Sequence, residues 1–375
     1  MKYYIIAGEA SGDLHGANLM SALRQRDPQA VFRFWGGDRM AAVGGEPVRH
    51  IRSLAIMGFF EVLTHLRTVL GNMAFCKRDI LRHRPDALIL IDYPGFNLRI
   101  ARFGRQHGMR TFYYISPMVW AWKKGRLKKM RGCIDHLYYI LPFERPFFEH
   151  NHFPQATYVG HPLIDEAERY RHRQGERAQL PAAPVVALLP GSRRQEIAVS
   201  MPAMLQVARK HPEYQFEIAG MSLLGKAHYQ ALLRDAPGNV SLRMDETYPI
   251  LGRSHAAIVC SGTATLEACL FDVPQVVCYR GGAISAAIAR RLLKVRFISL
   301  VNLVADRRVV AELVQEHFTL PALEEEFARI TQDTAHRAAM LQGYAEVRSA
   351  LGGAGASQRT AGLIVEALQD TPRLP

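Results

Sequence analysis

The feature that most constrains the fold is an alternation of short apolar runs with longer segments of helical period, which occurs twice along the chain. Many of these runs end in Gly, Pro, Asp or Ser, as strands that lead into functional loops do. The alternation predicts α/β architecture with parallel sheets covered by helices on both faces. Strands are expected at 3–8, 31–35, 87–92, 111–115 and 136–141, and again at 185–190, 215–220, 256–260 and 274–278.

The length of the chain suits two domains. Of its 375 residues, 49% are apolar, which is enough for each domain to bury a core. A charged and then Ala- and Pro-rich stretch, 165–184, indicates a linker. We expect two Rossmann-like domains, 1–170 and 171–345, that face a central cleft, and a helical tail, 346–375. The C-terminal helices are expected to pack back toward the first domain.

The net charge of +13 and the pI near 9.7 imply an anionic partner, either nucleic acid, an anionic membrane surface or a phosphorylated substrate. No uncharged apolar stretch approaches the ~20 residues of a membrane span, and the N-terminus lacks the pattern of a signal peptide. Five cysteines without C-x-x-C spacing favour buried, reduced thiols in a cytosolic protein over a zinc site.

Two loops of the second half have features of a phosphate site. In "VVALLPGSRRQEI" (185–197), Gly191 and Ser192 allow close backbone approach, and Arg193 adds a positive charge beside a helix N-terminus. A plain turn with an N-cap serine and a solvated arginine is the alternative. Neither this loop nor the next has the spacing of a P-loop or of G-x-G-x-x-G.

The second loop belongs to "IVCSGTATLEACL" (258–270), where a strand leads through Ser261, Gly262 and Thr263 into a helix. N–H groups at that helix start can bind a phosphate. Glu267, inside the helix, could accept hydrogen bonds from two ribose hydroxyls, or could be a surface or capping residue. Further on, Asn302 is a polar residue among aliphatic ones in 299–315.

A candidate base comes from the first half, in "ALILIDYPGFNLRIA" (87–101). Asp92 ends a continuous apolar strand, where partial desolvation would raise its pKa toward the range of a general base. The alternative is that Asp92 caps the next helix. Since that helix is expected to start only after Pro94-Gly95, Asn97 or Gly95 suits the cap better.

The first loop, "IIAGEASGDLHG" (5–16), leads into a helix expected from Leu14. The spacing of its glycines differs from that of the dinucleotide-binding fingerprint. Its two carboxylates, Glu9 and Asp13, would repel a pyrophosphate. These carboxylates suit the hydroxyls of a sugar-like acceptor, unless Ser11 or Asp13 simply caps the helix.

Apolar and basic stretches predict contact with a membrane surface. The segment 54–73 is unusually apolar for a helical period, and tryptophans directly precede a basic cluster in 115–132. Solvated helix faces are the alternative, and nucleic acid is not expected because no nucleic-acid module is visible. The candidate membrane contacts are Phe59, Phe60, Trp120, Trp122, Lys123, Lys124, Lys128 and Lys129.

Several motifs together resemble the lipid-A-disaccharide synthase family in their order along 5–315. They are "AGEASGDLHG", "LAIMGFFEVL", "LIDYPGFN", "ISPMVWAW", "LPFE", "VGHPL", "LLPGSRRQEI", "SGTATLE" and "SLVNL". The resemblance implies a GT-B fold and an inverting, metal-independent glycosyl transfer without a cofactor. The donor would be UDP-2,3-diacylglucosamine and the acceptor the 6-hydroxyl of 2,3-diacylglucosamine 1-phosphate, giving a β-1,6 disaccharide and UDP.

By position, the resemblance assigns the base to Asp92 and the motif arginine to Arg193. Glu267 and Asn302 would belong to the UDP site, and His161 of "VGHP" could touch the cleft or be structural. Gly95 stands where relatives often carry a second acid, which leaves the proton transfer to Asp92.

The resemblance also implies a cytoplasmic protein, peripheral on the inner face of the Gram-negative inner membrane. Oligomerisation of identical chains is left open. The alternatives are a UDP-sugar epimerase of the same fold and a non-enzymatic protein that binds membrane surfaces.

Overall fold

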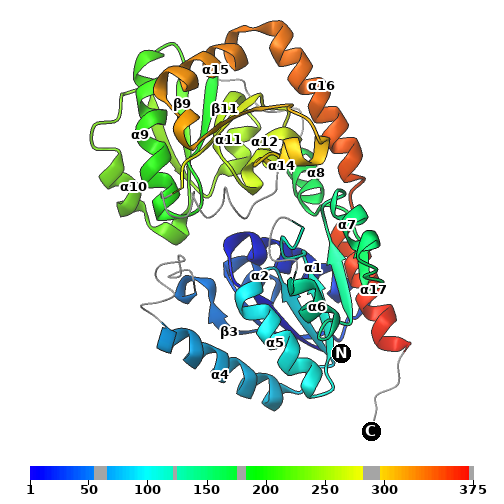
Figure 1. Cartoon of the computed structure of the whole chain (residues 1–375). Helices are drawn as coiled ribbons and strands as arrows, with labels where there is room; N and C mark the ends of the chain where they lie inside the picture. Colours follow the sequence, from blue (N-terminus) through cyan, green and yellow to red (C-terminus); the bar gives the residue numbers. More distant parts are fainter. Residues whose placement is uncertain (55–65, 121–124, 175–182, 282–295, 371–375) are drawn as a thin grey trace. The chain divides into compact units, whose positions relative to one another are not determined.

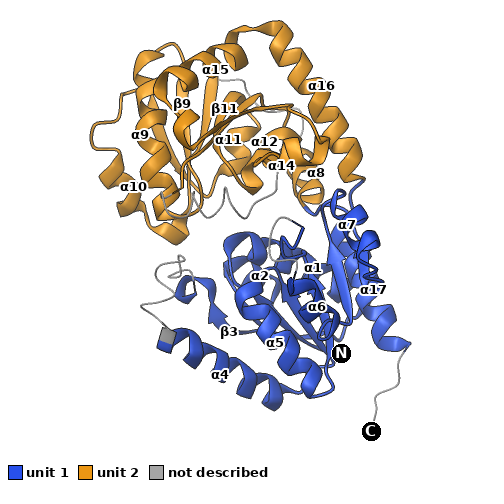
Figure 2. Ribbon diagram, in the orientation of Figure 1, with its two compact units in different colours: residues 1–162, 353–375 blue, residues 163–352 orange. Residues whose placement is uncertain are grey.

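The computed structural model describes residues 1–54, 66–120, 125–174, 183–281 and 296–370. The chain divides into two compact units, residues 1–162 with 353–375 (unit 1) and residues 163–352 (unit 2), as Figure 2 shows. Each unit contains a parallel sheet with helices around it (Figure 1), as the alternation of apolar runs predicts.

The sheet of unit 1 has the strand order β3-β2-β1-β4-β5-β6-β7, and all neighbouring strands are parallel. Both of its faces are buried. Tyr3 and Ile5 face one hydrophobic core while Tyr4 and Ile6 face the other, which is why the strand is a continuous apolar run. The strands are β1 (Lys2–Ala7), β2 (Val31–Gly36), β3 (Glu46–His50), β4 (Ala87–Ile91), β5 (Arg110–Tyr114), β6 (His136–Tyr139) and β7 (Ala156–Tyr158).

The helices of unit 1 include the last helix of the chain. Ala361, Ile364 and Val365 of α17 enter the same core as Leu19 and Leu23 of α1, so the prediction that C-terminal helices pack back toward the first domain is confirmed for α17. The α-helices are α1 (Ala10–Arg26), α2 (Asp38–Val43), α4 (Leu66–His83), α5 (Pro94–Gln106), α6 (Gly125–Arg131), α7 (Glu144–His150) and α17 (Ala356–Gln369), with a 3-10 turn at Ile51–Ser53.

Unit 2 repeats the design with the strand order β10-β9-β8-β11-β12-β13, again parallel throughout. Its strands are β8 (Val185–Leu189), β9 (Gln215–Gly220), β10 (Val240–Met244), β11 (Ser254–Cys260), β12 (Gln275–Tyr279) and β13 (Ala311–Val314). Its helices are α8 (Leu163–Gln174), α9 (Arg194–Lys210), α10 (Lys226–Leu232), α11 (Thr247–Leu251), α12 (Thr263–Leu270), α14 (Leu300–Ala305), α15 (Leu320–Gln332) and α16 (Thr334–Leu351), with 3-10 turns at Ser222–Leu224 and Gln315–His317.

The first boundary lies after residue 162 rather than near 170, because α8 packs into unit 2. The Tyr170 ring lies 5.4 Å from that of Phe271, and the Arg171 guanidinium donates a hydrogen bond to the Leu270 carbonyl. The expected linker therefore begins as a helix. The second boundary lies after residue 352 rather than at 345, because α16 also belongs to unit 2.

Within the described ranges, no helix is long and apolar enough to cross a membrane. The same residues contain no group of three His, Cys, Asp or Glu side chains that could hold a metal ion. All five cysteines are buried and form no disulfide.

Candidate active site

The predicted base and the first loop of unit 1 meet at one place in the sheet. The strand order reverses between β1 and β4, and in such sheets ligands bind beyond the carboxyl ends of the strands at this switch point. A Cβ atom on Gly8 would lie 2.4 Å from the Tyr93 ring. Glycine thus lets the turn after β1 approach the turn after β4, which carries Asp92.

The backbone of Asp92 is firmly held. Its N–H donates to the Tyr114 carbonyl at 3.0 Å, and its own carbonyl accepts hydrogen bonds from the Asn97 amide at 2.8 Å and the Tyr113 hydroxyl at 2.5 Å. Its φ of 43° is a left-handed conformation that aspartate adopts more readily than most residues. The half-buried side chain is therefore presented from a rigid turn at the carboxyl end of β4.

The helix after Asp92 starts earlier than expected. It begins at Pro94, whose fixed φ suits a first helical position, and Tyr93 is the N-cap. The prediction that Asn97 or Gly95 caps this helix is wrong. Asn97 is fully buried, and its amide donates to the carbonyl groups that end β1 and β4, those of Ile6, Ile91 and Asp92.

The other acceptor candidates lie in or before the first turn of α1, which begins at Ala10 rather than Leu14. Glu9 is its exposed N-cap, and Ser11 is half-buried. Asp13 is 4% exposed and accepts three backbone N–H groups at the start of α2, those of Gly37, Arg39 and Met40, at 2.6, 3.1 and 3.1 Å. The carboxylate of Asp13 therefore holds α1 to α2, and contact with an acceptor sugar would require it to give up these bonds.

His161, the remaining candidate in unit 1, is buried beside a second histidine. His161 follows β7, and His15 lies on α1; both are less than 5% exposed. Burial lowers the pKa of His15 to about 4 and, together with the neighbouring His15, that of His161 to about 3. Both imidazoles are therefore neutral at pH 7.

The two phosphate-site candidates of unit 2 also lie at a switch point, where β8 and β11 are neighbours. The turn after β8 contains Gly191, with a φ of 115°. A Cβ atom there would lie 2.8 Å from a carboxylate oxygen of Glu196 and 3.4 Å from the sulfur of Cys260, which ends β11. Glycine therefore lets the first turn lie against the end of the neighbouring strand.

In the turn after β8, the backbone N–H groups that would bind a phosphate already donate to a carboxylate. Glu196 accepts hydrogen bonds from the N–H groups of Ser192 at 3.1 Å and Arg193 at 3.2 Å, and its other oxygen lies 2.9 Å from the Arg193 guanidinium. The sequence pattern gives no sign of this role of Glu196. A phosphate that binds these N–H groups would have to replace a carboxylate.

The second turn is more open. Gly262 is exposed and is the N-cap of α12, and no atom of the described residues lies within 4 Å of the place that a Cβ atom would take. Ser261 donates its hydroxyl proton to the Ile298 carbonyl at 2.9 Å, and Thr263 begins the helix. Glu267 is half-buried on the same helix.

Asn302 is fully committed to the fold of unit 2. Its amide donates to the Val310 carbonyl at 3.0 Å and to Glu312 at 2.8 Å, and its oxygen accepts the N–H groups of Val309 at 2.7 Å and Val310 at 3.0 Å. A direct bond from this side chain to UDP would break one of these four. Asn302 thus fixes the segment between α14 and β13 rather than presenting a free amide.

We expect Asn302→Ala to lower the free energy of unfolding of unit 2 by about 3 kcal/mol or more, because it leaves several buried polar groups without partners. Arg308→Ala, an exposed residue on the same segment, is the control and should change it by less than ~1 kcal/mol. Urea unfolding followed by circular dichroism measures both. Equal stability of the two variants would contradict the role given to Asn302.

The membrane candidates are described only in part. Phe59, Phe60, Trp122, Lys123 and Lys124 lie outside the described residues. Lys128 and Lys129 are exposed on α6, as a surface contact requires. Trp120 is half-buried, with its ring edge-on to Phe143 at 4.8 Å, which argues against a surface anchor at this position.

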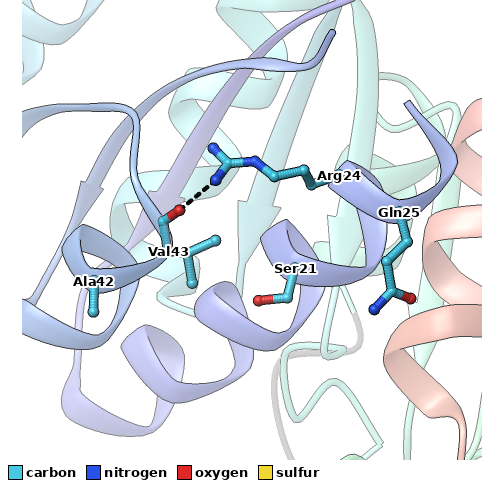
Figure 3. Close-up of a pocket in the computed structure, with 5 residues that line it drawn as sticks. All are labelled: Ser21, Arg24, Gln25, Ala42 and Val43. Atoms are coloured by element: carbon cyan, nitrogen blue, oxygen red, sulfur yellow. Dashed lines mark hydrogen bonds between the residues drawn. The ribbon is translucent and has the colours of Figure 1, made fainter. Parts of the chain in front are cut away.

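Two hollows of about 470 Å³ lie in unit 1 away from these loops. Figure 3 shows the hollow between α1 and α2, where Arg24 donates to the Val43 carbonyl at 2.6 Å. Its lining contains none of the predicted site residues. The other lies between α4 and α5 and combines cationic with apolar side chains, those of Leu70, Met73, Lys77, Arg99, Arg102, Phe103 and Gln106.

Residues 3–362 match the model of the family described as lipid-A-disaccharide synthetase. The chain belongs to this family. It is 38% identical to the lipid-A-disaccharide synthase of Geobacter metallireducens, over 97% of this chain and 96% of that one. It is 39% identical to that of Chromohalobacter salexigens, over 100% and 99% of the two chains. A glycosyl-transfer step in lipid A synthesis follows from this membership.

The folds of solved structures agree with the GT-B prediction. A UDP-N-acetylglucosamine 2-epimerase described as putative, from Listeria monocytogenes, has a TM-score of 0.70 at 12% identity and covers 100% of this chain and 98% of its own. The calicheamicin glycosyltransferase CalG4 has a TM-score of 0.62 at 16% identity, covering 99% and 98%. The epimerase of Neisseria meningitidis, solved with UDP-GlcNAc, has a TM-score of 0.64 at 12% identity, covering 99% and 100%.

In this member of the lipid-A-disaccharide synthetase family, the structure adds one carboxyl group to the site of unit 1. Glu144, in the "LPFE" stretch after β6, is 1% exposed. Burial, and to a smaller extent the charge of Asp92, raise its pKa to about 8, although the Ser116 hydroxyl and the Leu141 N–H act to lower it. The sequence alone did not single it out, because a glutamate at a helix start usually faces solvent.

Proposed function

We propose that this protein transfers 2,3-diacylglucosamine from its UDP donor to the 6-hydroxyl of 2,3-diacylglucosamine 1-phosphate, with inversion and without a metal ion. The observation that carries the proposal is the position of Asp92 on a rigid turn at the switch point of unit 1, in a chain of the lipid-A-disaccharide synthetase family. Asp92 takes the proton of the acceptor hydroxyl as this oxygen attacks the anomeric carbon.

The donor belongs to unit 2, where two glycine-containing turns follow neighbouring strands. The open turn of Gly262 at the start of α12 binds the diphosphate through backbone N–H groups, and Glu267 on the same helix binds the ribose. Arg193 leaves Glu196 for the diphosphate and stabilises the charge that develops on the leaving UDP. A fold neighbour solved with UDP-GlcNAc agrees with a nucleotide-sugar donor.

The acceptor and its acyl chains belong to unit 1, on the side of an anionic membrane surface. The hollow between α4 and α5 supports this because it combines apolar side chains such as Leu70 and Phe103 with three cationic ones, Lys77, Arg99 and Arg102. Exposed Lys128 and Lys129 on α6 add positive charge. We place the protein at the inner face of the inner membrane on this basis.

The reaction itself is the test. Purified protein is incubated with both proposed substrates in detergent and EDTA, while UDP release and the masses of the lipid products are followed. We expect UDP and a disaccharide 1-phosphate in equal amounts. Loss of activity in EDTA that added Mg²⁺ restores would contradict the metal-independent mechanism.

The same assay separates the alternatives. An epimerase, which the fold neighbours also include, would isomerise UDP-N-acetylglucosamine without releasing UDP or needing a lipid acceptor. A surface-binding protein without catalytic activity would do neither. UDP release without disaccharide would point to another acceptor.

A further inference from the structure

The carboxyl group of Glu144 lies beside Asp92 through the order of the strands. β4, β5 and β6 are neighbours, and Ile91, Tyr114 and Tyr138 are paired across them. Asp92 directly follows the first of these residues, Ser116 lies two residues past the second, and Glu144 begins α7 after the third strand. Three polar groups thus lie along the same edge of the sheet.

The surroundings of Glu144 provide few hydrogen-bond donors that could stabilise a negative charge on its carboxyl group. One carboxyl oxygen accepts the Leu141 N–H at 3.3 Å, whereas the other is buried and has no hydrogen-bond partner among the residues that the structure describes. A buried carboxylate with so few donors is costly, so the neutral form is favoured. The Ser116 hydroxyl is near enough to lower the pKa of Glu144, but it is only 8% exposed and donates its proton to the Pro117 carbonyl at 3.0 Å, so it does not serve the unpartnered oxygen.

The other titratable groups described around Glu144 do not stabilise its ionised form. The pKa values of Tyr139 on β6 and Tyr158 on β7 are raised, in part by the charge of Glu144. Both tyrosines are therefore neutral near pH 8. Arg145, the next residue on α7, lies 5.6 Å over the Tyr158 ring and acts on both tyrosines. Among the residues that the structure describes, Asp92 is the charged group that acts directly on the Glu144 carboxyl.

We propose that Glu144 is a positioning residue that acts through Asp92: Glu144 keeps its proton, so that the single negative charge of the two carboxyl groups stays on Asp92. The role rests on the proposed function, in which Asp92 is the base. Ionisation of Glu144 places a second negative charge at this edge of the sheet, where the phosphorylated acceptor is proposed to bind. The protonated form of Glu144 is therefore the working form, and its ionisation weakens acceptor binding.

The first experiment follows the titration of Glu144 in the full chain, by NMR of carboxyl-13C-labelled glutamate with the resonance assigned through Glu144→Gln. We expect a pKa near 8 in the wild type and a lower pKa in Asp92→Asn, because the like charge is removed while the burial of Glu144 remains. This measurement needs no substrate, so it stands apart from the test of the proposed function. A pKa in the ordinary range of glutamate, or one that Asp92→Asn leaves unchanged, would overturn the proposal.

The second experiment compares kcat/KM for the acceptor at pH 9 and pH 7. The wild type should lose about tenfold over the pH unit above the Glu144 pKa. Glu144→Gln, which is neutral at every pH, should lose much less, and the loss should lie in KM. Glu149→Gln, an exposed glutamate on α7, is the matched control and should follow the wild type. An alkaline loss in Glu144→Gln equal to that of the wild type contradicts the role.

Discussion

Asp92→Asn is expected to lower kcat by a factor of about 10²–10⁴, the usual contribution of a general base. Asparagine keeps the shape of the side chain and tolerates the φ of 43° at this position, whereas alanine would add strain of about 1–2 kcal/mol in the left-handed region. The hydrogen bonds of the turn use the backbone of Asp92 and survive the change. A loss of turnover would therefore report on the chemistry rather than on the fold.

The chain offers a matched control for this substitution. Asp245 also directly follows a parallel strand, β10, and has a φ of 58°. Its oxygen accepts the Ser222 N–H at 3.0 Å, a bond that asparagine can also make. Asp245→Asn should retain turnover, and both variants should bind UDP like the wild type, because the proposed donor site lies in unit 2. Equal turnover of the two variants would remove Asp92 as the base.

Whether a strand can be recognised from its sequence depends on where it lies in its sheet. Every predicted strand is present, and each of the four unpredicted strands in the described part of the chain, β3, β7, β10 and β13, lies at an edge of a sheet. Interior strands are buried on both faces and read as apolar runs, whereas an edge strand such as β3, "EPVRH", is largely exposed and polar. The edge strands were therefore recognisable only after their neighbours were placed.

The candidate site was predictable in its loops but not in its hydrogen bonds. Glycines and polar residues at strand ends indicated the turns after β1, β4, β8 and β11, and the structure places these strands at the switch points of the two sheets, where parallel sheets commonly bind ligands. The sequence could not show that the side chains of Asp13 and Asn302 form hydrogen bonds with other parts of their own units. Nor could it show that Glu196 accepts the N–H groups of its loop. These partners lie on other elements or depend on the side-chain conformation, so spacing alone does not reveal them.

The neutral pair His15 and His161 should make unit 1 sensitive to acid. Unfolded histidine binds a proton below about pH 6.5, whereas the folded-state pKa values are about 4 and 3. Between these limits the unfolded chain binds more protons, so the free energy of unfolding falls as the pH falls through this window. Each pKa unit is worth about 1.4 kcal/mol, so the loss can be a large part of the stability of a domain.

The measurement must separate this effect from that of Glu144, whose pKa is raised to about 8. A raised carboxyl pKa makes stability fall as the pH rises from about 4.5 to 8, which partly offsets the histidines in their common range. We therefore compare His15→Asn and His161→Asn with the wild type at each pH. The variants should be less stable at pH 7, and the difference should shrink toward pH 4, because asparagine has no proton to bind.

The chain supplies a probe that reports on unit 1 alone. All three tryptophans, Trp35, Trp120 and Trp122, fall within residues 1–162, and none falls in unit 2. Urea unfolding followed by tryptophan fluorescence at pH 4, 5, 6 and 7 therefore reads the stability of the unit that contains both histidines. His150→Asn, an exposed histidine on α7, is the control and should stay parallel to the wild type. A stability difference that stays constant from pH 7 to 4 would show that the two imidazoles gain protons in the folded protein as readily as in the unfolded chain, which their burial below 5% exposure argues against.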